Sequence, residues 1–303
     1  MLEMLHYDFM VRALLAGLMV GSICPAAGVF LVLRRYSFMA ETLAHVSLAG
    51  AAIGMLLGIF PLVTTVTVVV LVAVTVELLR SRQKLYPDAL LALVMSGGLA
   101  LAVVLLSMTR GFNVDVMSYL FGSILTVTQL DLLIIIAVGL VVLGIIGFLF
   151  KELYFISFDE ECARVAGLPV EWLNFIFILV VAGTISISVR LVGALLVSAL
   201  MVIPVITAFL VACSFRQAFY AAVCLGMATT VSGLTVSYYL GTASGGTVVL
   251  LAVAIFGAVV VGKKLKSLFR CRLLLKAGSP SGALNPVKKS IEIYPGHDLP
   301  LDQ

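Results

Sequence analysis

Residues 132–150 read LLIIIAVGLVVLGIIGFLF, nineteen consecutive positions without a charged side chain. A helix needs about 20 apolar residues to cross a hydrocarbon core of about 30 Å. Comparable runs follow one another from residue 10 to residue 262, so no room remains for a separate soluble enzyme domain. The sequence therefore predicts an all-α fold, a polytopic bundle of transmembrane helices.

The composition of the whole chain fits lipid as its main solvent. Of the 303 residues, 62% are hydrophobic and 11% are charged, whereas a soluble domain has roughly 45–50% apolar and about 25% charged residues. The net charge of +4 comes from Lys and Arg gathered at the ends of apolar runs, which does not indicate nucleic-acid binding. The five cysteines form no C-x-x-C pair, so a zinc finger and a thioredoxin-like motif are not indicated.

The apolar runs predict eight or nine helices, because the stretch 172–212 is nearly continuous and is interrupted by Arg190. The expected helices cover residues 10–33, 43–59, 62–80, 89–108, 128–150, 172–190, 192–212, 217–240 and 246–262. Lys and Arg in short loops favour the cytoplasm. This rule predicts that Arg34, Lys151 and the C-terminus are cytoplasmic. Arg110 and Arg190 then lie on the outer side, where the rule disfavours Lys and Arg.

Three segments are expected along the chain. Residues 1–262 form the transmembrane domain. Residues 263–276, KKLKSLFRCRLLLK, contain six Lys or Arg residues, a pattern typical of a basic helix lying on anionic lipid. Residues 277–303 are polar and contain several prolines, which predicts a disordered cytoplasmic tail.

The stretch SFMAETLAHVSLAG (37–50) carries the strongest candidate for chemistry inside a predicted span. Glu41 and His45 are four residues apart and so share one face of a helix. Ionisable groups are costly in a membrane, and a carboxylate beside an imidazole forms half of a site for a divalent transition metal. Alternatively, Glu41 pairs with Arg34 or Arg35 near the interface and His45 is a buried hydrogen-bonding residue. The spacing leaves both interpretations open.

Gly50, Gly54 and Gly58 follow on the same helix as overlapping G-x-x-x-G motifs, which let helices approach closely in lipid. At about 100° per residue, Gly50 lies opposite Glu41 and Gly54 lies opposite His45. We therefore expect one face to pack and the other to present two ligands to a pathway or a dimer seam. Two copies would supply two carboxylates and two imidazoles. Such a set suits tetrahedral zinc, whereas manganese prefers more oxygen ligands.

Other charged positions predict local structure. Glu77 and Arg80 are spaced for an ion pair on a helix surface. Asp115 and Asp131 are expected to be solvated or to cap helices, with guidance of cations as the less favoured alternative. The string GAVVVGKK (257–264) imitates a phosphate-binding loop, but it ends in Lys rather than Ser or Thr and closes an apolar helix. The chain is therefore expected to contain no ATPase of its own.

The segment KELYFISFDEECARVAGLPVE (151–171) predicts a short helix between two spans. Ser157 or Asp159 can cap its start, and Gly167 followed by Pro169 ends it. It is either a docking element for a soluble partner or an ordinary connecting helix.

Several of these stretches together resemble the permease subunits of the bacterial manganese/zinc/iron family of ABC transporters. The matching stretches, in order, are FLVLRRYSFMAETLAHVSLAGAAIG (30–54), SYLFGSIL (118–125), SFDEECARVAGLPVEWLN (157–174), RLVGALLVSALMVIPVITA (190–208) and SGGTVVLLA (244–252). The resemblance covers most of residues 10–262. The wording ETLAHVS is more similar to the zinc-uptake members than to the manganese members.

The resemblance implies the architecture of the vitamin-B12/metal type of ABC importer permease, in a bacterial cell membrane. It implies a homodimer with two cytoplasmic ABC ATPase subunits and an extracellular metal-binding lipoprotein. The cargo would be zinc, or alternatively manganese or iron, and no cofactor would be bound permanently. The family commonly has Asp where this chain has Glu41, paired with the histidine that matches His45. The longer side chain leaves the exact geometry and the ion preference open.

The resemblance also assigns the segment 157–168 to coupling with the ATPase. Its expected interface residues are Asp159, Ala163, Gly167 and Leu168. Pro204 lies within a predicted span, where it removes a backbone hydrogen bond, and it is a candidate hinge. Competing functions are a gradient-driven metal carrier, an importer of metal chelates and an intramembrane hydrolase; the last lacks a nucleophile–base motif.

Overall fold

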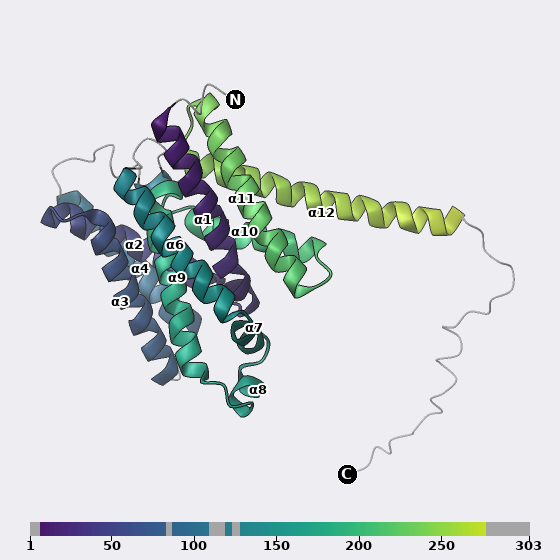
Figure 1. Ribbon diagram of the computed structural model, residues 1–303, viewed down its shortest axis with the longest axis horizontal. Helices are drawn as coiled ribbons and strands as arrows, with labels where there is room; N and C mark the ends of the chain where they lie inside the picture. The colour runs from purple at the N-terminus through teal and green to yellow at the C-terminus, as the bar shows by residue number, and fades with distance from the viewer. Residues whose placement is uncertain (1–6, 83–86, 109–118, 123–127, 277–303) are drawn as a thin grey trace, which may run out of the picture. The chain divides into compact units, whose positions relative to one another are not determined.

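The computed structural model describes residues 7–82, 87–108, 119–122 and 128–276, and these residues form α-helices joined by turns (Figure 1). Asp115, Arg110 and half of the SYLFGSIL stretch (118 and 123–125) lie outside the described residues. The predicted disordered tail, residues 277–303, lies outside them as well.

Eight of the helices are long and apolar enough to cross a membrane. They are α1 (Asp8–Leu33), α2 (Ser37–Leu57), α3 (Pro61–Arg82), α4 (Pro87–Met108), α6 (Gln129–Phe148), α9 (Val170–Val192), α11 (Phe215–Leu240) and α12 (Ser244–Lys276). The all-α polytopic bundle predicted from the apolar runs is confirmed. Helix α2 begins six residues earlier than predicted, because polar residues interrupt the apolar pattern in its first turns.

The predicted span 192–212, which would raise the number of spans from eight to nine, is a shorter helix, α10 (Val197–Val211). Its 15 residues rise about 22 Å, which is less than a hydrocarbon core of about 30 Å. The interruption before it lies at residues 193–196 and not at Arg190, which is in the last turn of α9. Gly193 adopts φ +93° there, a conformation that ends α9. Pro204 lies inside α10, buried within the bundle.

Helices α1, α2 and α9 are mostly buried, whereas only a minority of the residues of α3, α4, α6 and α11 are buried. Helix α1 packs against α6, α9, α10 and α11, and α2 packs against α3 and α4. Close approach is possible because glycines replace larger side chains at the crossings. A Cβ atom on Gly21 would stand 2.8 Å from the carbonyl oxygen of Gly226 in α11. The core of the bundle therefore rests on small-residue packing, as expected in lipid.

Helix α12 continues without interruption from Ser244 to Lys276. The sequence had predicted a span that ends at residue 262 and a separate basic helix over 263–276, and this helix boundary was wrong. After Gly262 the sequence contains no Gly or Pro until the helix ends, so nothing in it breaks the backbone pattern. Residues up to 259 belong to one compact unit and the residues from 260 onward to a second. A position for residues 263–276 on lipid stays a prediction.

Two short helices lie between α6 and α9, namely α7 (Phe150–Phe158) and α8 (Glu160–Val165). They lie at the end of the bundle where α9 begins (Figure 1). Arg34, at the end of α1, reaches this region, and Lys151 and Arg216 line one pocket beside it. This end of the bundle, which we call the basic end, collects the cations that the short-loop rule predicts to be cytoplasmic.

Candidate functional site

Helix α2 is buried along nearly its whole length, and its exceptions form one strip. Between residues 39 and 54, the side chains that are not buried are Glu41, His45 and Ile53. Glu41 is exposed and His45 is half-buried, and their spacing of four places both on the same helix face. The helix thus presents a carboxylate and an imidazole on a surface that the described residues cover only in part.

Neither arginine of the preceding turn holds Glu41. In the described part of the chain, the acidic partners in ion pairs are Glu77, Glu160 and Asp131. Arg34 is bonded to other groups, and Arg35 is exposed. Nδ1 of His45 is buried without a hydrogen-bond partner among the described residues, and both interpretations of this side chain stay predictions.

The opposite face of α2 packs on α3 through glycine. A Cβ atom on Gly50 would stand 2.8 Å from Cα of Thr65, and one on Gly54 would stand 2.8 Å from Cα of Pro61. Gly58 does not pack, contrary to the prediction: it ends α2 in the left-handed conformation, with φ +65° and open space around it. Of the three glycines in the G-x-x-x-G repeat, Gly50 and Gly54 therefore pack against α3, and Gly58 is the C-cap of α2.

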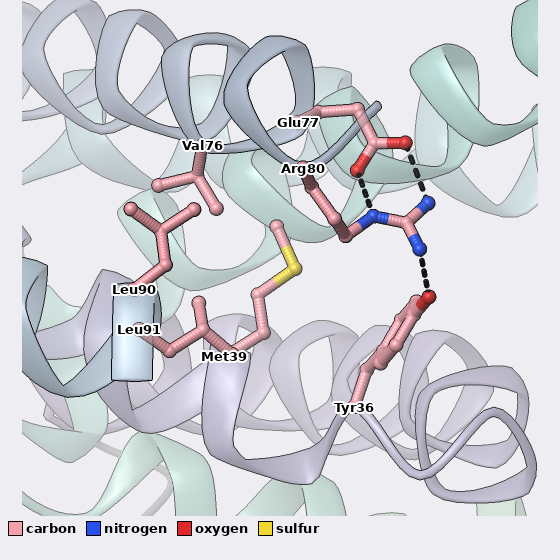
Figure 2. A pocket seen from close by; sticks show the side chains of 7 residues that line it. All are labelled: Tyr36, Met39, Val76, Glu77, Arg80, Leu90 and Leu91. Atoms are coloured by element: carbon pink, nitrogen blue, oxygen red, sulfur yellow. Dashed lines mark hydrogen bonds and ion pairs between the residues drawn. The ribbon is translucent and has the colours of Figure 1, made fainter. Parts of the chain in front are cut away.

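The start of α2 is attached to α3 by a polar contact (Figure 2). Arg80 donates from Nε and Nη2 to the two carboxylate oxygens of Glu77, at 2.9 and 2.8 Å. Its Nη1 donates to the hydroxyl of Tyr36, and the guanidinium lies 5.0 Å from the centre of the Tyr36 ring. The Glu77–Arg80 pair is thus largely buried and joins two helices, whereas the sequence had predicted an ion pair on a helix surface.

The cavity beside this contact has room for about one water molecule. It is lined by Met39, Val76, Leu90 and Leu91 together with the polar group of Tyr36, Glu77 and Arg80 (Figure 2). Its volume is about 20 Å³, which is close to the space that one water molecule requires. The cavity is therefore a packing defect between α2, α3 and α4.

The segment predicted to couple to an ATPase forms α7 and α8, separated by Asp159. Oδ1 of Asp159 accepts a hydrogen bond of 2.9 Å from the backbone N–H of Cys162, which caps α8. This bond lowers the pKa of the Asp159 carboxyl group. Gly167 adopts φ +83° just after the helix ends. Asp159 and Gly167 are both exposed.

Two of the four expected interface residues point inward. Ala163 has no exposed surface and packs with Ile156, Val170 and Leu173, and Leu168 packs against the same cluster. Ala163 therefore fixes α8 to the bundle and offers no surface to a partner, which corrects the prediction. The outward side chain that the sequence reasoning missed is Val165, 90% exposed. The sequence of α8 carries no signal that distinguishes an outward Val165 from an inward Ala163, because both residues are apolar.

At the other end of α9, a buried ion pair joins two helices. Asp131 has no exposed surface, and its Oδ1 lies 3.0 Å from Nη1 of Arg190, although this N–H does not point along the contact as in a hydrogen bond. Asp131 also forms a capping box with Thr128 at the start of α6. Of the two predicted roles, capping is present and solvation is not. The pairing with Arg190 was not predicted, and it explains why this cation is tolerated at the end opposite to the basic end.

Glycines bring three segments together near this pair. Gly122 and Gly193 have positive φ angles, and a Cβ atom on Gly193 would stand 2.5 Å from the backbone nitrogen of Gly122. Gly245, in the first turn of α12, would place a Cβ atom 2.6 Å from the carbonyl oxygen of Phe121. The SGGT stretch therefore begins α12 in direct backbone contact with two loops.

The residues of the described chain form no cluster of three or more His, Cys, Asp or Glu side chains. Among the described residues, Glu41 and His45 therefore have no third His, Cys, Asp or Glu side chain beside them. The model of the ABC 3 transport family matches residues 6–263. The chain belongs to the ABC 3 transport family.

Relatives in this family are similar over nearly their full length. A Treponema pallidum protein named "Probable metal transport system membrane protein" is 38% identical over 257 residues, which cover 85% of this chain and 96% of the relative. ZnuB of Haemophilus influenzae, a high-affinity zinc uptake system membrane protein, is 30% identical and is covered to 96%, with 82% of this chain aligned. ScaB of Streptococcus gordonii, a manganese import system permease, is 30% identical, over 82% of this chain and 90% of the relative.

A solved structure shows the same fold. PsaBC from Streptococcus pneumoniae in complex with Fab matches with a TM-score of 0.76 and 28% identity. The match covers 84% of this chain and 91% of that chain. The architecture of this ABC 3 family member is therefore that of an ABC importer permease.

Proposed function

We propose that this ABC 3 family member is the transmembrane permease subunit of an ATP-driven importer of a divalent transition metal ion, and that the ion is zinc. The observation that carries the proposal is the Glu41–His45 strip on the otherwise buried helix α2. One ring nitrogen of His45 is buried without a partner, and in the described part of the chain no arginine forms an ion pair with Glu41. Glu41 is exposed to a passing cation, and the buried nitrogen of His45 has no hydrogen bond that would compete with an ion.

A homodimer completes the coordination. Two strips facing each other provide two carboxylates and two imidazoles, a donor set that matches tetrahedral zinc. The two ligands of one chain alone would leave half of that coordination to water. The metal is cargo, so the site has to bind it weakly enough to release it, which is in keeping with a site divided between two subunits.

The choice of zinc rests on the nitrogen donors and on relatives such as ZnuB. Manganese is the alternative, because other relatives are named for manganese import and because Glu41 supplies oxygen ligands, which manganese prefers. Iron is a further alternative within the same family.

The proposed assembly places the subunit in a bacterial cell membrane with its basic end and its C-terminus in the cytoplasm. Two copies of the chain join two cytoplasmic ABC ATPase subunits, which hydrolyse ATP, and an extracellular metal-binding lipoprotein, which delivers the ion. The subunit itself catalyses no reaction. Helix α8, with Val165 and Asp159 exposed, is the surface offered to the ATPase.

The test is uptake of zinc, manganese and iron by the complete complex in proteoliposomes, with ATP inside or absent. We expect ATP-dependent zinc uptake that is lost in Glu41→Gln and in His45→Ala. Glu171→Gln is the matched control, since Glu171 is an exposed glutamate in the first turn of α9. Normal zinc uptake in both site variants would reject the site, and uptake driven by an ion gradient without ATP would replace the importer by a carrier.

A further inference from the structure

The turn between α1 and α2 is hydrogen-bonded to helices on two of its sides, α7 and α9 on one and α3 on the other. On one side, Nε of Arg34 donates to Oγ of Ser157 at 3.0 Å, and Nη1 of Arg34 donates to Oδ1 of Asn174 at 2.6 Å. On the other side, the hydroxyl of Tyr36 accepts a hydrogen bond from Arg80 of α3 (Figure 2). Two residues of one turn, Arg34 and Tyr36, thus connect α7, α9 and α3.

The contacts of Arg34 extend to α8, the exposed short helix. Asn174 donates from Nδ2 to Oε1 of Glu160 at 3.4 Å, and Glu160 is the first residue of α8. Ser157 is in the last turn of α7, where its hydroxyl donates to the carbonyl oxygen of Leu153. Arg34 is therefore tied, directly or through one side chain, to both short helices of the basic end.

The guanidinium of Arg34 is an unusual group at this position. Its plane lies 4.5 Å from the centre of the Phe177 ring, and burial lowers its pKa to about 10, so it stays charged at neutral pH. The hydrogen bonds of its Nε and Nη1 go to neutral side chains, while Nη2 is buried without a partner. A buried charge with an unmet donor is costly.

The position of Arg34 determines what it can move. Helix α2 begins at Ser37, three residues later, and Glu41 follows about 6 Å further along the helix axis. The Tyr36–Arg80 contact and the close packing at Gly50 and Gly54 join α2 to α3. A displacement of the turn would therefore shift α2 with α3, and the Glu41–His45 strip with them.

We propose that Arg34 is a positioning residue that transmits displacement of α7 and α8 to α2, and so to Glu41 and His45. The inference rests on the proposed function, in which a partner ATPase moves α8. Ser157 and Asn174 are the contacts that receive the movement. Tyr36 and Arg80 make α2 and α3 respond together.

The experiment uses the complete complex in proteoliposomes and measures zinc ions transported per ATP hydrolysed. We expect Arg34→Ala to lower this ratio about tenfold, within the range of measured coupling energies, while ATP hydrolysis continues. Arg34→Lys keeps the charge but loses the two-pronged geometry, and it should lower the ratio as well. Arg35→Ala removes the neighbouring exposed cation and should leave the ratio unchanged. A parallel fall of hydrolysis and transport in Arg34→Ala would overturn the proposal.

Asn174→Ala provides a second variant and a test of the shared path. If Arg34 acts through Asn174, the double variant should be no worse than Arg34→Ala alone, because the two residues belong to one interaction. Effects that multiply independently would overturn the relay through Asn174.

Spin labels separate this inference from the identity of the cargo. In a chain whose native cysteines are replaced by serine, we place labels at Leu57→Cys on α2 and Tyr239→Cys on α11, both exposed positions. Their separation should change between the ADP state and the vanadate-trapped state, and Arg34→Ala should abolish the change. An unaltered change in Arg34→Ala would overturn the relay. If the complex does not transport zinc but still shows a change in separation that depends on Arg34, the proposed cargo is rejected and the relay is retained.

Discussion

Asp131 of α6 and Arg190 of α9 form an ion pair of 3.0 Å at the end of the bundle opposite to Arg34. The carboxylate is fully buried, and the guanidinium also lies 5.7 Å from the Phe60 ring centre and 5.9 Å from that of Tyr119. The pair fixes the last turn of α9 beside the loop that breaks the chain before α10. Each partner compensates the charge of the other, and either charge would be costly to bury without its partner.

We expect Asp131→Asn to destabilise the protein by about 3–5 kcal/mol, because it leaves Arg190 as an unpaired buried cation. Replacing both partners, as Asp131→Asn with Arg190→Gln, should restore part of the loss. Thermal unfolding in detergent, read as a double-mutant cycle, measures the coupling. The exposed pair Glu160–Arg164 serves as control, and Arg164→Ala should cost less than about 1 kcal/mol. Equal effects of Arg164→Ala and Asp131→Asn would contradict the assignment.

The glycines of α2 make a second prediction about packing. Gly50→Ala and Gly54→Ala should each lower stability, because the added Cβ meets backbone of α3 at 2.8 Å. Gly97→Ala, in α4 with open space around the new Cβ, should be neutral or stabilise by roughly 0.5–1 kcal/mol, the usual gain in a helix interior. Thermal unfolding of the three variants decides the point. A loss in Gly97→Ala as large as in Gly50→Ala would show that helix packing is not the cause.

The two sides of α8 predict opposite outcomes for two substitutions. Val165→Asp should weaken co-purification with the partner ATPase while leaving thermal stability unchanged, because Val165 is 90% exposed. Ala163→Leu should lower thermal stability, because the added atoms overfill a site with no exposed surface. Both variants are compared by melting temperature and by recovery of the ATPase after mild detergent extraction. Unchanged ATPase recovery in Val165→Asp would remove this face of α8 from the interface.

The spans could be predicted from sequence because hydrocarbon thickness fixes the length of an apolar run. The predicted start of α2 was six residues too late, since Glu41 and Thr42 interrupt the apolar run although they lie inside the helix. The Glu41–His45 pair could be found because a spacing of four is a local property.

Partners that are distant in the chain could not be predicted. Arg34 and Asn174 are 140 residues apart, and their contact depends on how α1 crosses α9. Likewise, the sequence of α8 gave no means of telling that Ala163 faces the bundle while Val165 faces outward. That distinction is set by the packing of α8 on α7 and α9.

If the Glu41–His45 strip contacts the ion, substitutions in it should change the preference between zinc and manganese. His45→Asp replaces an imidazole by a carboxylate, so a pair of facing strips would offer oxygen ligands alone. Since oxygen ligands suit manganese and imidazole suits zinc, we expect the ratio of zinc to manganese uptake to fall in this variant. Glu41→Asp retains the carboxylate one methylene further back, and it should keep more zinc uptake than Glu41→Gln. Competitive uptake of the two ions by the reconstituted complex measures both effects. If His45→Asp leaves the zinc-to-manganese ratio of the wild type unchanged while transport continues, the imidazole does not contact the ion and the preference is set elsewhere along the path.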